Sequence, residues 1–153
     1  MRRSIAAVLL AAAALPALAD ERMQPVTDPE TRAECSACHM AFPAGFLPAR
    51  SWQAIMAGLD SHFGENAALA PDVTARIEAW LAANAADSRG RSEVLRGLDP
   101  SVTPLRISDL PWWQREHGPR EVNPAAFADP AVGSKANCVA CHRAADRGIF
   151  EDD

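Results

Sequence analysis

Two copies of the pattern Cys-x-x-Cys-His constrain this chain more than any other feature. They contain all four of its cysteines and lie near opposite ends of the 153 residues, at Cys35-Ser-Ala-Cys38-His39 and Cys138-Val-Ala-Cys141-His142. Within one helical turn, residues three positions apart project from the same face, so both thiols of a motif can bond to one planar molecule. In c-type haem attachment, two thioethers join such cysteines to the porphyrin and the histidine binds the iron as proximal ligand. We therefore predict two covalent haem c groups.

Three other uses of paired cysteines explain the motifs less well. Disulfides are the ordinary expectation in an exported chain, but they give no role to His39 and His142. A four-cysteine zinc site joins two Cys-x-x-Cys elements about 15–20 residues apart, whereas these lie about a hundred residues apart. A thioredoxin-like dithiol needs a βαβ context, which the sequence lacks. Haem attachment is the best interpretation.

The first 19 residues have the features of a cleaved secretory signal peptide. Arg2 and Arg3 precede an apolar stretch, and Ala17-Leu18-Ala19 forms a small-x-small cleavage site. The apolar stretch is shorter than the ~20 residues that cross a bilayer as a helix. We expect export to the periplasm, a mature chain that begins at Asp20, and no insertion in the membrane after cleavage.

The mature chain is acidic. Cleavage removes Arg2 and Arg3 and no acidic residue, which leaves 13 basic and 20 acidic side chains and a formal charge of −7. This balance disfavours nucleic acid as a partner and favours a protein with a basic patch.

Frequent prolines and few aromatic residues shape the expected fold. Prolines recur from Pro25 to Pro130, and no stretch alternates with the period of a strand. With five Phe, four Trp and no Tyr, short helices would bury little apolar surface unless the haems formed the core. We predict an all-α fold of short helices and long loops. It should form two cytochrome c-like lobes, over residues 20–95 and 96–153, each packed around one haem.

Local signals predict where several helices begin. Asp28 and Pro29 suit the cap and first position of a helix before the first motif, and Ser134 is a candidate cap before the second. Apolar residues at helical spacing predict helices over 50–63 and 72–84. A further short helix should begin near Pro111, with Ser108 or Asp109 as its cap, and end before Gly118.

The two remaining histidines, His62 and His117, are the candidate distal ligands. His62 continues the apolar stripe of the helix predicted over 50–63, and His117 ends the helix predicted near Pro111. Ligation by both would make each haem bis-histidine and six-coordinate. The alternatives are a packed core histidine and a surface histidine at a helix end.

Methionine is the competing distal ligand. Met56 shares the predicted helix face with His62, whereas Met40 directly follows His39 and is badly placed to reach the opposite face of the same porphyrin. Imidazole in place of a thioether lowers the reduction potential, so bis-histidine ligation predicts two low-potential haems. Because short loops close at lower entropic cost, we favour local pairs, His39 with His62 and His142 with His117, over crossed pairs.

The chain resembles the dihaem cytochrome c family of bacterial periplasms. Besides the haem motifs, the resemblance rests on the stretches at residues 35–43, 47–52, 61–66, 83–87, 106–108, 115–117 and 136–142. It implies a carrier with two bis-histidine haems, held by Cys35, Cys38, His39, His62, His117, Cys138, Cys141 and His142. It also implies a high-spin, oxygen-binding monohaem cytochrome c as electron acceptor and a membrane cytochrome b as donor. We expect a monomer.

Six-coordinate iron has no vacant position for a substrate, so we predict an electron-transfer protein and not an enzyme. The alternative is a dihaem enzyme of the peroxidase or nitrogen-oxide reductase type, with one five-coordinate iron and acid or base groups nearby, such as Glu116. A haem-based sensor is disfavoured because the sequence shows no output domain.

Overall fold

The computed structural model describes residues 22–90 and 92–150. Within these residues the chain forms helices and loops and no β-strand, which confirms the predicted all-α class. The signal peptide predicted over residues 1–19 lies outside them. The α-helices are α1 (Pro29–Cys35), α2 (Ala49–Ala57), α3 (Pro71–Ala83) and α4 (Pro111–Glu116). The short 3-10 helices are η1 (Ala44–Phe46), η2 (Leu59–Ser61), η3 (Glu93–Leu95), η4 (Ile107–Asp109), η5 (Pro124–Ala128), η6 (Cys138–Ala140) and η7 (Ala145–Arg147).

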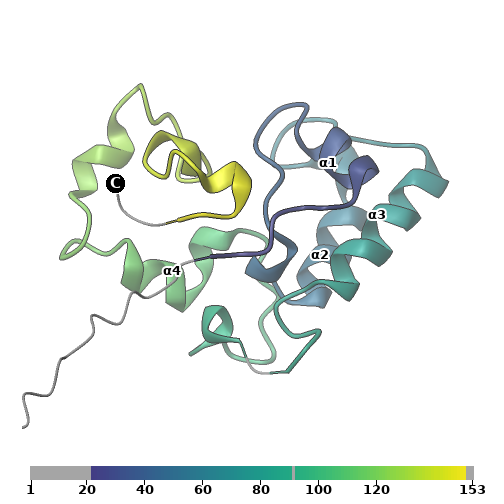
Figure 1. Cartoon of the computed structure of the whole chain (residues 1–153), viewed down its shortest axis with the longest axis horizontal. Coiled ribbons are helices and arrows are strands. Elements are labelled where there is room, and N and C mark those ends of the chain that lie inside the picture. The colour runs from purple at the N-terminus through teal and green to yellow at the C-terminus, as the bar shows by residue number, and fades with distance from the viewer. Residues whose placement is uncertain (1–21, 91, 151–153) are drawn as a thin grey trace, which may run out of the picture.

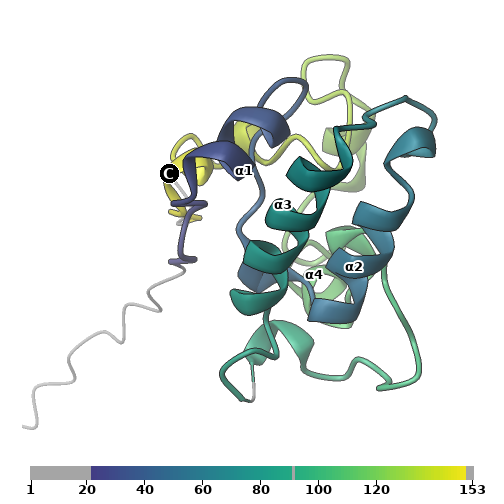
Figure 2. The same ribbon diagram turned by 90° about the vertical axis from the view of Figure 1, so that its right-hand side faces the viewer.

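The helices are arranged in two lobes (Figure 1). In the N-terminal lobe, α3 packs against both α1 and α2, and Figure 2 shows α2 and α3 side by side. The other lobe contains α4 and the segment that runs from it to residue 150 (Figure 1). η3 and η4, which precede α4 in the sequence, pack against it. The boundary between residues 95 and 96 stays a prediction.

One buried cluster joins the two lobes. It contains Phe46 from the first lobe and Leu110, Trp113 and Phe150 from the second. The Phe46 ring packs edge-on against Phe150 at 5.1 Å and stacks with Trp112 at 5.9 Å. Aromatic pairs at these separations add to the free energy gained from buried area alone. Direct side-chain packing therefore holds the lobes together.

Two helix predictions are confirmed, the start of α1 and the extent of α3. Asp28 caps α1, accepting a hydrogen bond from the N–H of Thr31 at 2.8 Å, and Pro29 takes the first helical position. α3 covers nearly the predicted range, and the side chain of Asn84 closes it by donating to the carbonyl of Trp80 at 2.8 Å. Local sequence signals therefore place the start of α1 and both ends of α3 to within one residue.

Two other helix predictions are wrong. The helix expected over 50–63 ends at Ala57, because Gly58 leaves the helical conformation and the single turn η2 follows. His62 therefore lies beyond α2 and not on its apolar stripe. Ser134 caps only a turn, since its Oγ accepts from the N–H of Ala136 at 3.1 Å and the second motif forms the 3-10 turn η6. A segment this short cannot offset the cost of nucleating an α-helix.

The helix expected near Pro111 is confirmed as α4, with a different cap. Leu110 takes the cap position, because Ser108 and Asp109 belong to the preceding turn η4. His117 is the residue that closes the helix, as predicted.

The two ends of the described chain pair with each other next to Gly148. The N–H of Met23 donates to the carbonyl of Gly148 at 2.8 Å, and Arg22 forms an isolated β-bridge with Ile149. Gly148 has φ +79°, and a Cβ there would lie 1.9 Å from the carbonyl oxygen of Met23. Only glycine fits this position.

Replacing Gly148 with alanine should lower the free energy of unfolding by about 1–3 kcal/mol, because the left-handed backbone and the clash both oppose the bridge. Urea denaturation measures the change. Gly133→Ala is the matched control, since Gly133 has φ +69° but its nearest neighbour would lie 3.8 Å from the new Cβ. Equal losses in the two variants would show that the terminal pairing does not depend on Gly148.

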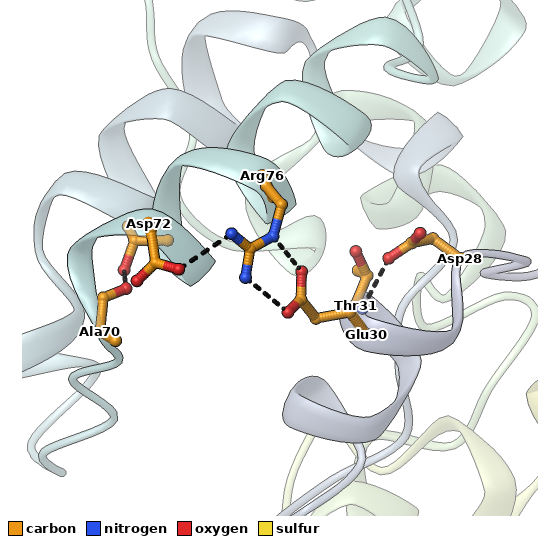
Figure 3. Close-up of polar contacts among 7 residues, drawn as sticks. Asp28, Glu30, Thr31, Ala70, Asp72 and Arg76 are labelled. Carbon is orange, nitrogen blue, oxygen red and sulfur yellow. Dashed lines mark hydrogen bonds and ion pairs between the residues drawn. The ribbon is translucent and has the colours of Figure 1, made fainter.

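An exposed ion cluster fastens α1, the helix that ends at Cys35 of the first motif, to α3 (Figure 3). Arg76 on α3 binds Glu30 on α1 through two hydrogen bonds of 2.8 and 2.9 Å, and Asp72 through one of 2.9 Å. The hydrogen bonds from Arg76 hold the pKa of both carboxylates below their ordinary values. Exposed pairs contribute little to stability singly, but this fork holds the guanidinium in one orientation.

The ion cluster predicts an acid-sensitive part of the stability. Because the folded-state pKa of Glu30 is lowered, the unfolded state binds more protons as the pH falls, and the contribution of Glu30 is lost. It should be complete above the ordinary value of 4.5 and disappear as the pH falls through the lower folded-state pKa. Urea midpoints of the wild type and Glu30→Gln should therefore differ at pH 7 and converge in acid. A difference that persists unchanged in acid would contradict this.

Candidate haem sites

The first motif lies where α1 ends. Cys35 is the last residue of α1, and the N–H of Ser36 closes the helix by donating to the carbonyl of Arg32 at 3.0 Å. Cys38 follows in an exposed turn. Cys35 is half-buried, and burial, with a smaller effect of Glu34, raises the pKa of its thiol. The two thiols therefore come from a helix end and a turn, not from one helical face as the sequence suggested.

His39 is held in one tautomer by its neighbour. Its Nδ1 lies 2.7 Å from the carbonyl oxygen of Met40. Because a carbonyl only accepts, this hydrogen bond needs the ring proton on Nδ1 and leaves Nε2 available for a metal. Phe42 stacks on the ring at 4.8 Å.

The structure brings His62 to His39. Their ring centres are 6.2 Å apart, and the ring planes differ by 26°. A tight turn presents His62, since the N–H of Glu65 donates to its carbonyl at 3.1 Å and Phe63 has φ +52°. Burial, and then the charges of His39 and Arg106, lower the pKa of His62, which favours the neutral imidazole that binds metals.

Met56, the rival ligand, lies near the end of α2. Its side chain is 6% exposed and belongs to the core cluster.

The second motif is a short 3-10 turn without an α-helix. Cys138 begins η6, and its carbonyl accepts from the N–H of His142 at 2.8 Å. Cys138 packs partly buried against the core, and this burial raises the pKa of its thiol, whereas Cys141 is exposed. The Nδ1 atom of His142 is buried and makes no hydrogen bond.

His117 meets His142 across the second site. Their ring centres are 6.0 Å apart, with planes at 77°. His117 lies flat on the ring of Trp113, at 4.3 Å and 5°. Its Nδ1 is 3.1 Å from the carbonyl oxygen of the same tryptophan, which again leaves Nε2 for a metal. All four histidines therefore meet in the two local pairs that the sequence favoured.

Other metal and redox uses of the cysteines find no support. None of the four forms a disulfide. In the described ranges, no group of three or more His, Cys, Asp or Glu side chains is placed to hold a metal ion. What the chain offers at each end is two unpaired thiols beside two histidines, and this donor set fits a covalent haem.

Three residues near the histidines were not singled out from the sequence. Arg106 lies over the ring of Phe63 with its Cζ 4.1 Å from the ring centre, and Lys135 lies near the ring of Trp113, at 5.4 Å. Phe63 touches His62 edge-on at 4.8 Å. No local sequence signal predicts the positive φ of Phe63. The grouping of Phe63, Arg106 and Lys135 with the histidines depends on long-range contacts.

Comparisons with known proteins agree with this reading. Residues 31–150 match the family model "Dihaem cytochrome c". A diheme cytochrome c from Rhodobacter sphaeroides is 55% identical with a TM-score of 0.79, and the alignment covers 83% of this chain and 99% of the other. A diheme cytochrome c from Shewanella baltica is 40% identical with a TM-score of 0.66, covering 80% of this chain and 86% of the other. The comparison with curated protein sequences found no match.

The family match spans most of the chain, and both similar structures share its fold at high identity. The two cysteine pairs described above match the two haems that this family carries. This chain therefore belongs to the dihaem cytochrome c family and carries two haem c groups.

Proposed function

We propose that the protein is a periplasmic electron carrier in which two histidines bind each haem iron. His39 and His62 would hold the first iron, and His142 and His117 the second. The observation that carries the proposal is the distance between the rings in each pair, 6.2 and 6.0 Å. Histidine nitrogens bind metals at roughly 2 Å, the value for zinc, so two rings on opposite sides of one ion have centres roughly 6 Å apart.

Cys35 and Cys38 would form the thioether bonds to the first haem, and Cys138 and Cys141 those to the second. Each haem supplies a one-electron ferric–ferrous couple when bound. With an imidazole on either side of the iron no position is open to a substrate, so electron transfer is the activity that this arrangement favours. Two imidazoles also predict low reduction potentials.

The chain orients the histidines through backbone carbonyls. Met40 and Trp113 each accept a hydrogen bond from Nδ1, of His39 and His117 respectively, which holds each ring with Nε2 available. Such a partner also makes the imidazole a stronger electron donor to the metal. The buried Nδ1 of His142 lacks a partner of this kind. Each site therefore has one histidine that a backbone carbonyl orients, His39 in the first and His117 in the second.

The predicted signal peptide supports the periplasmic location in this proposal. The acidic net charge supports a partner with a basic surface. The described residues contain no helix that is long and apolar enough to cross a membrane. With a formal charge of −7, the mature chain would dock on a basic surface. A high-spin monohaem cytochrome c as acceptor, a membrane cytochrome b as donor and a monomeric carrier complete the proposal.

Carbon monoxide distinguishes the carrier from an enzyme. The ferrous holoprotein should give the same absorption spectrum with and without the gas, because a bis-histidine haem has no free position. It should also show no turnover with peroxide or nitric oxide. Ready formation of a carbon monoxide adduct at one haem, together with such turnover, would contradict the proposed carrier function and favour the dihaem enzyme.

A further inference from the structure

Each candidate distal histidine touches an aromatic ring that has a cation over it. At the first site, Phe63 packs edge-on against His62 at 4.8 Å, and the guanidinium of Arg106 lies 4.1 Å from the centre of the Phe63 ring. Arg106 comes from the loop that leads to η4, more than forty residues further along the chain. Phe63 is 46% exposed, and Arg106 lies over one face of its ring.

The second site repeats this arrangement with different residues. Trp113 stacks on His117 at 4.3 Å, and the ammonium of Lys135 lies 5.4 Å from the centre of the Trp113 ring. The same ammonium is 5.7 Å from the centre of Phe127. These distances are in the range of cation–π attraction, which keeps a flexible side chain in place. The ion pairs found in the described ranges involve neither Arg106 nor Lys135, so neither side chain is in direct contact with a carboxylate there.

We propose that Arg106 and Lys135 set the reduction potentials of the two haems, Arg106 acting on the first and Lys135 on the second. The inference rests on the proposed ligation of iron by His62 and His117. An aromatic ring that packs against the distal histidine holds each cation in place. The cation acts by its charge and does not touch the iron.

The physical reason is the charge that the iron loses on reduction. A ferrous haem has one positive charge fewer than a ferric haem, so a nearby cation favours the ferrous form and raises the potential. Arg106 should have the larger effect, because it lies closer to its ring and its guanidinium is always charged. The cations would thus partly offset the lowering of the potential by two imidazole ligands.

The test is a spectroelectrochemical titration of the holoprotein at low ionic strength. Arg106→Gln should raise the ferric-to-ferrous ratio of the first haem at a fixed electrode potential by roughly three- to tenfold. Tenfold corresponds to 59 mV for a one-electron couple. Lys135→Gln should move the second haem in the same direction by less, so each variant is the control for the other. His62→Ala, which perturbs the first haem, assigns the two titration waves.

Two further measurements separate charge from packing. Arg106→Lys and Lys135→Arg keep the charge and should keep most of the wild-type potential. The shifts in the glutamine variants should also shrink in high salt, because these side chains are exposed and salt screens their charges.

Unchanged potentials in both glutamine variants would overturn the inference. So would equal movement of both haems in each variant, or the same shift in Arg106→Lys as in Arg106→Gln. If His62→Ala instead leaves all of the iron low-spin, the ligand assignment has failed, and this result is read from the spin state and not from the potentials.

Discussion

Replacing His62 with alanine should open the first haem while the second stays closed. Without an imidazole opposite His39, the first iron loses its sixth ligand, becomes high-spin in the ferric state and binds carbon monoxide in the ferrous state. His117→Ala should do the same at the second haem. In each variant one of the two haems changes, and its potential rises. Absorption and electron paramagnetic resonance (EPR) spectra of the two variants measure these effects.

Met56→Leu is the control that makes this prediction decisive. Met56 is the rival ligand, and leucine keeps its volume within the core cluster. We expect this variant to stay fully low-spin with only a small loss of stability. If His62→Ala stays low-spin and Met56→Leu becomes high-spin, the methionine is the ligand and the assignment of His62 is wrong.

Replacing both Cys138 and Cys141 with serine should halve the haem content and unfold the second lobe. From α4 to residue 150 the chain has one α-helix of 6 residues and several 3-10 turns, with Trp113, Ala145 and Phe150 as its buried hydrophobic residues. So small a core cannot offset the conformational entropy of this segment without a haem. The haem content should fall from two per chain to one in a pyridine haemochrome assay. Protease should then cleave the second lobe far faster than in the wild type.

The mirror variant, with Cys35 and Cys38 replaced by serine, is the comparison. The N-terminal lobe contains α2 packed on α3 and the ion cluster of Arg76, so it should retain more of its structure when its haem is lost. Equal protease resistance of the second lobe with and without its haem would contradict the view that the haem forms its core.

The sequence was sufficient wherever local chemistry decides the structure. The two haem motifs predicted the cofactor, Asp28 with Pro29 predicted the start of α1, and Pro111 predicted the start of α4. The entropic cost of loop closure favoured local histidine pairs, and the structure brings these same pairs together.

Tertiary contacts decided what the sequence could not predict. Helical periodicity extended α2 to Phe63, but Gly58 ends it and a turn with φ +52° at Phe63 presents His62 instead. The periodicity of apolar residues does not register this turn, nor its contact with Arg106, a residue of a distant loop. The contact of Phe46 with Phe150 likewise joins opposite ends of the chain and leaves no local signal.

The geometry of the histidine pairs makes the two proposed haems distinguishable by spectroscopy. The ring planes differ by 26° in the first pair and by 77° in the second. Nearly parallel imidazoles donate into the same iron orbital and split the two π-type d orbitals of the iron strongly. Nearly perpendicular imidazoles donate into both orbitals and leave them close in energy. The first haem should therefore give a rhombic EPR signal, and the second a broad signal with one large g value.

The most direct test of two closed haems is the EPR spectrum of the ferric holoprotein at low temperature, integrated against its haem content. We predict two low-spin signals of equal intensity, one rhombic and one with a large g value, which together account for all of the iron. A high-spin signal that accounts for one haem of the two would contradict bis-histidine ligation at that site and, with it, the assignment of the protein as a simple carrier.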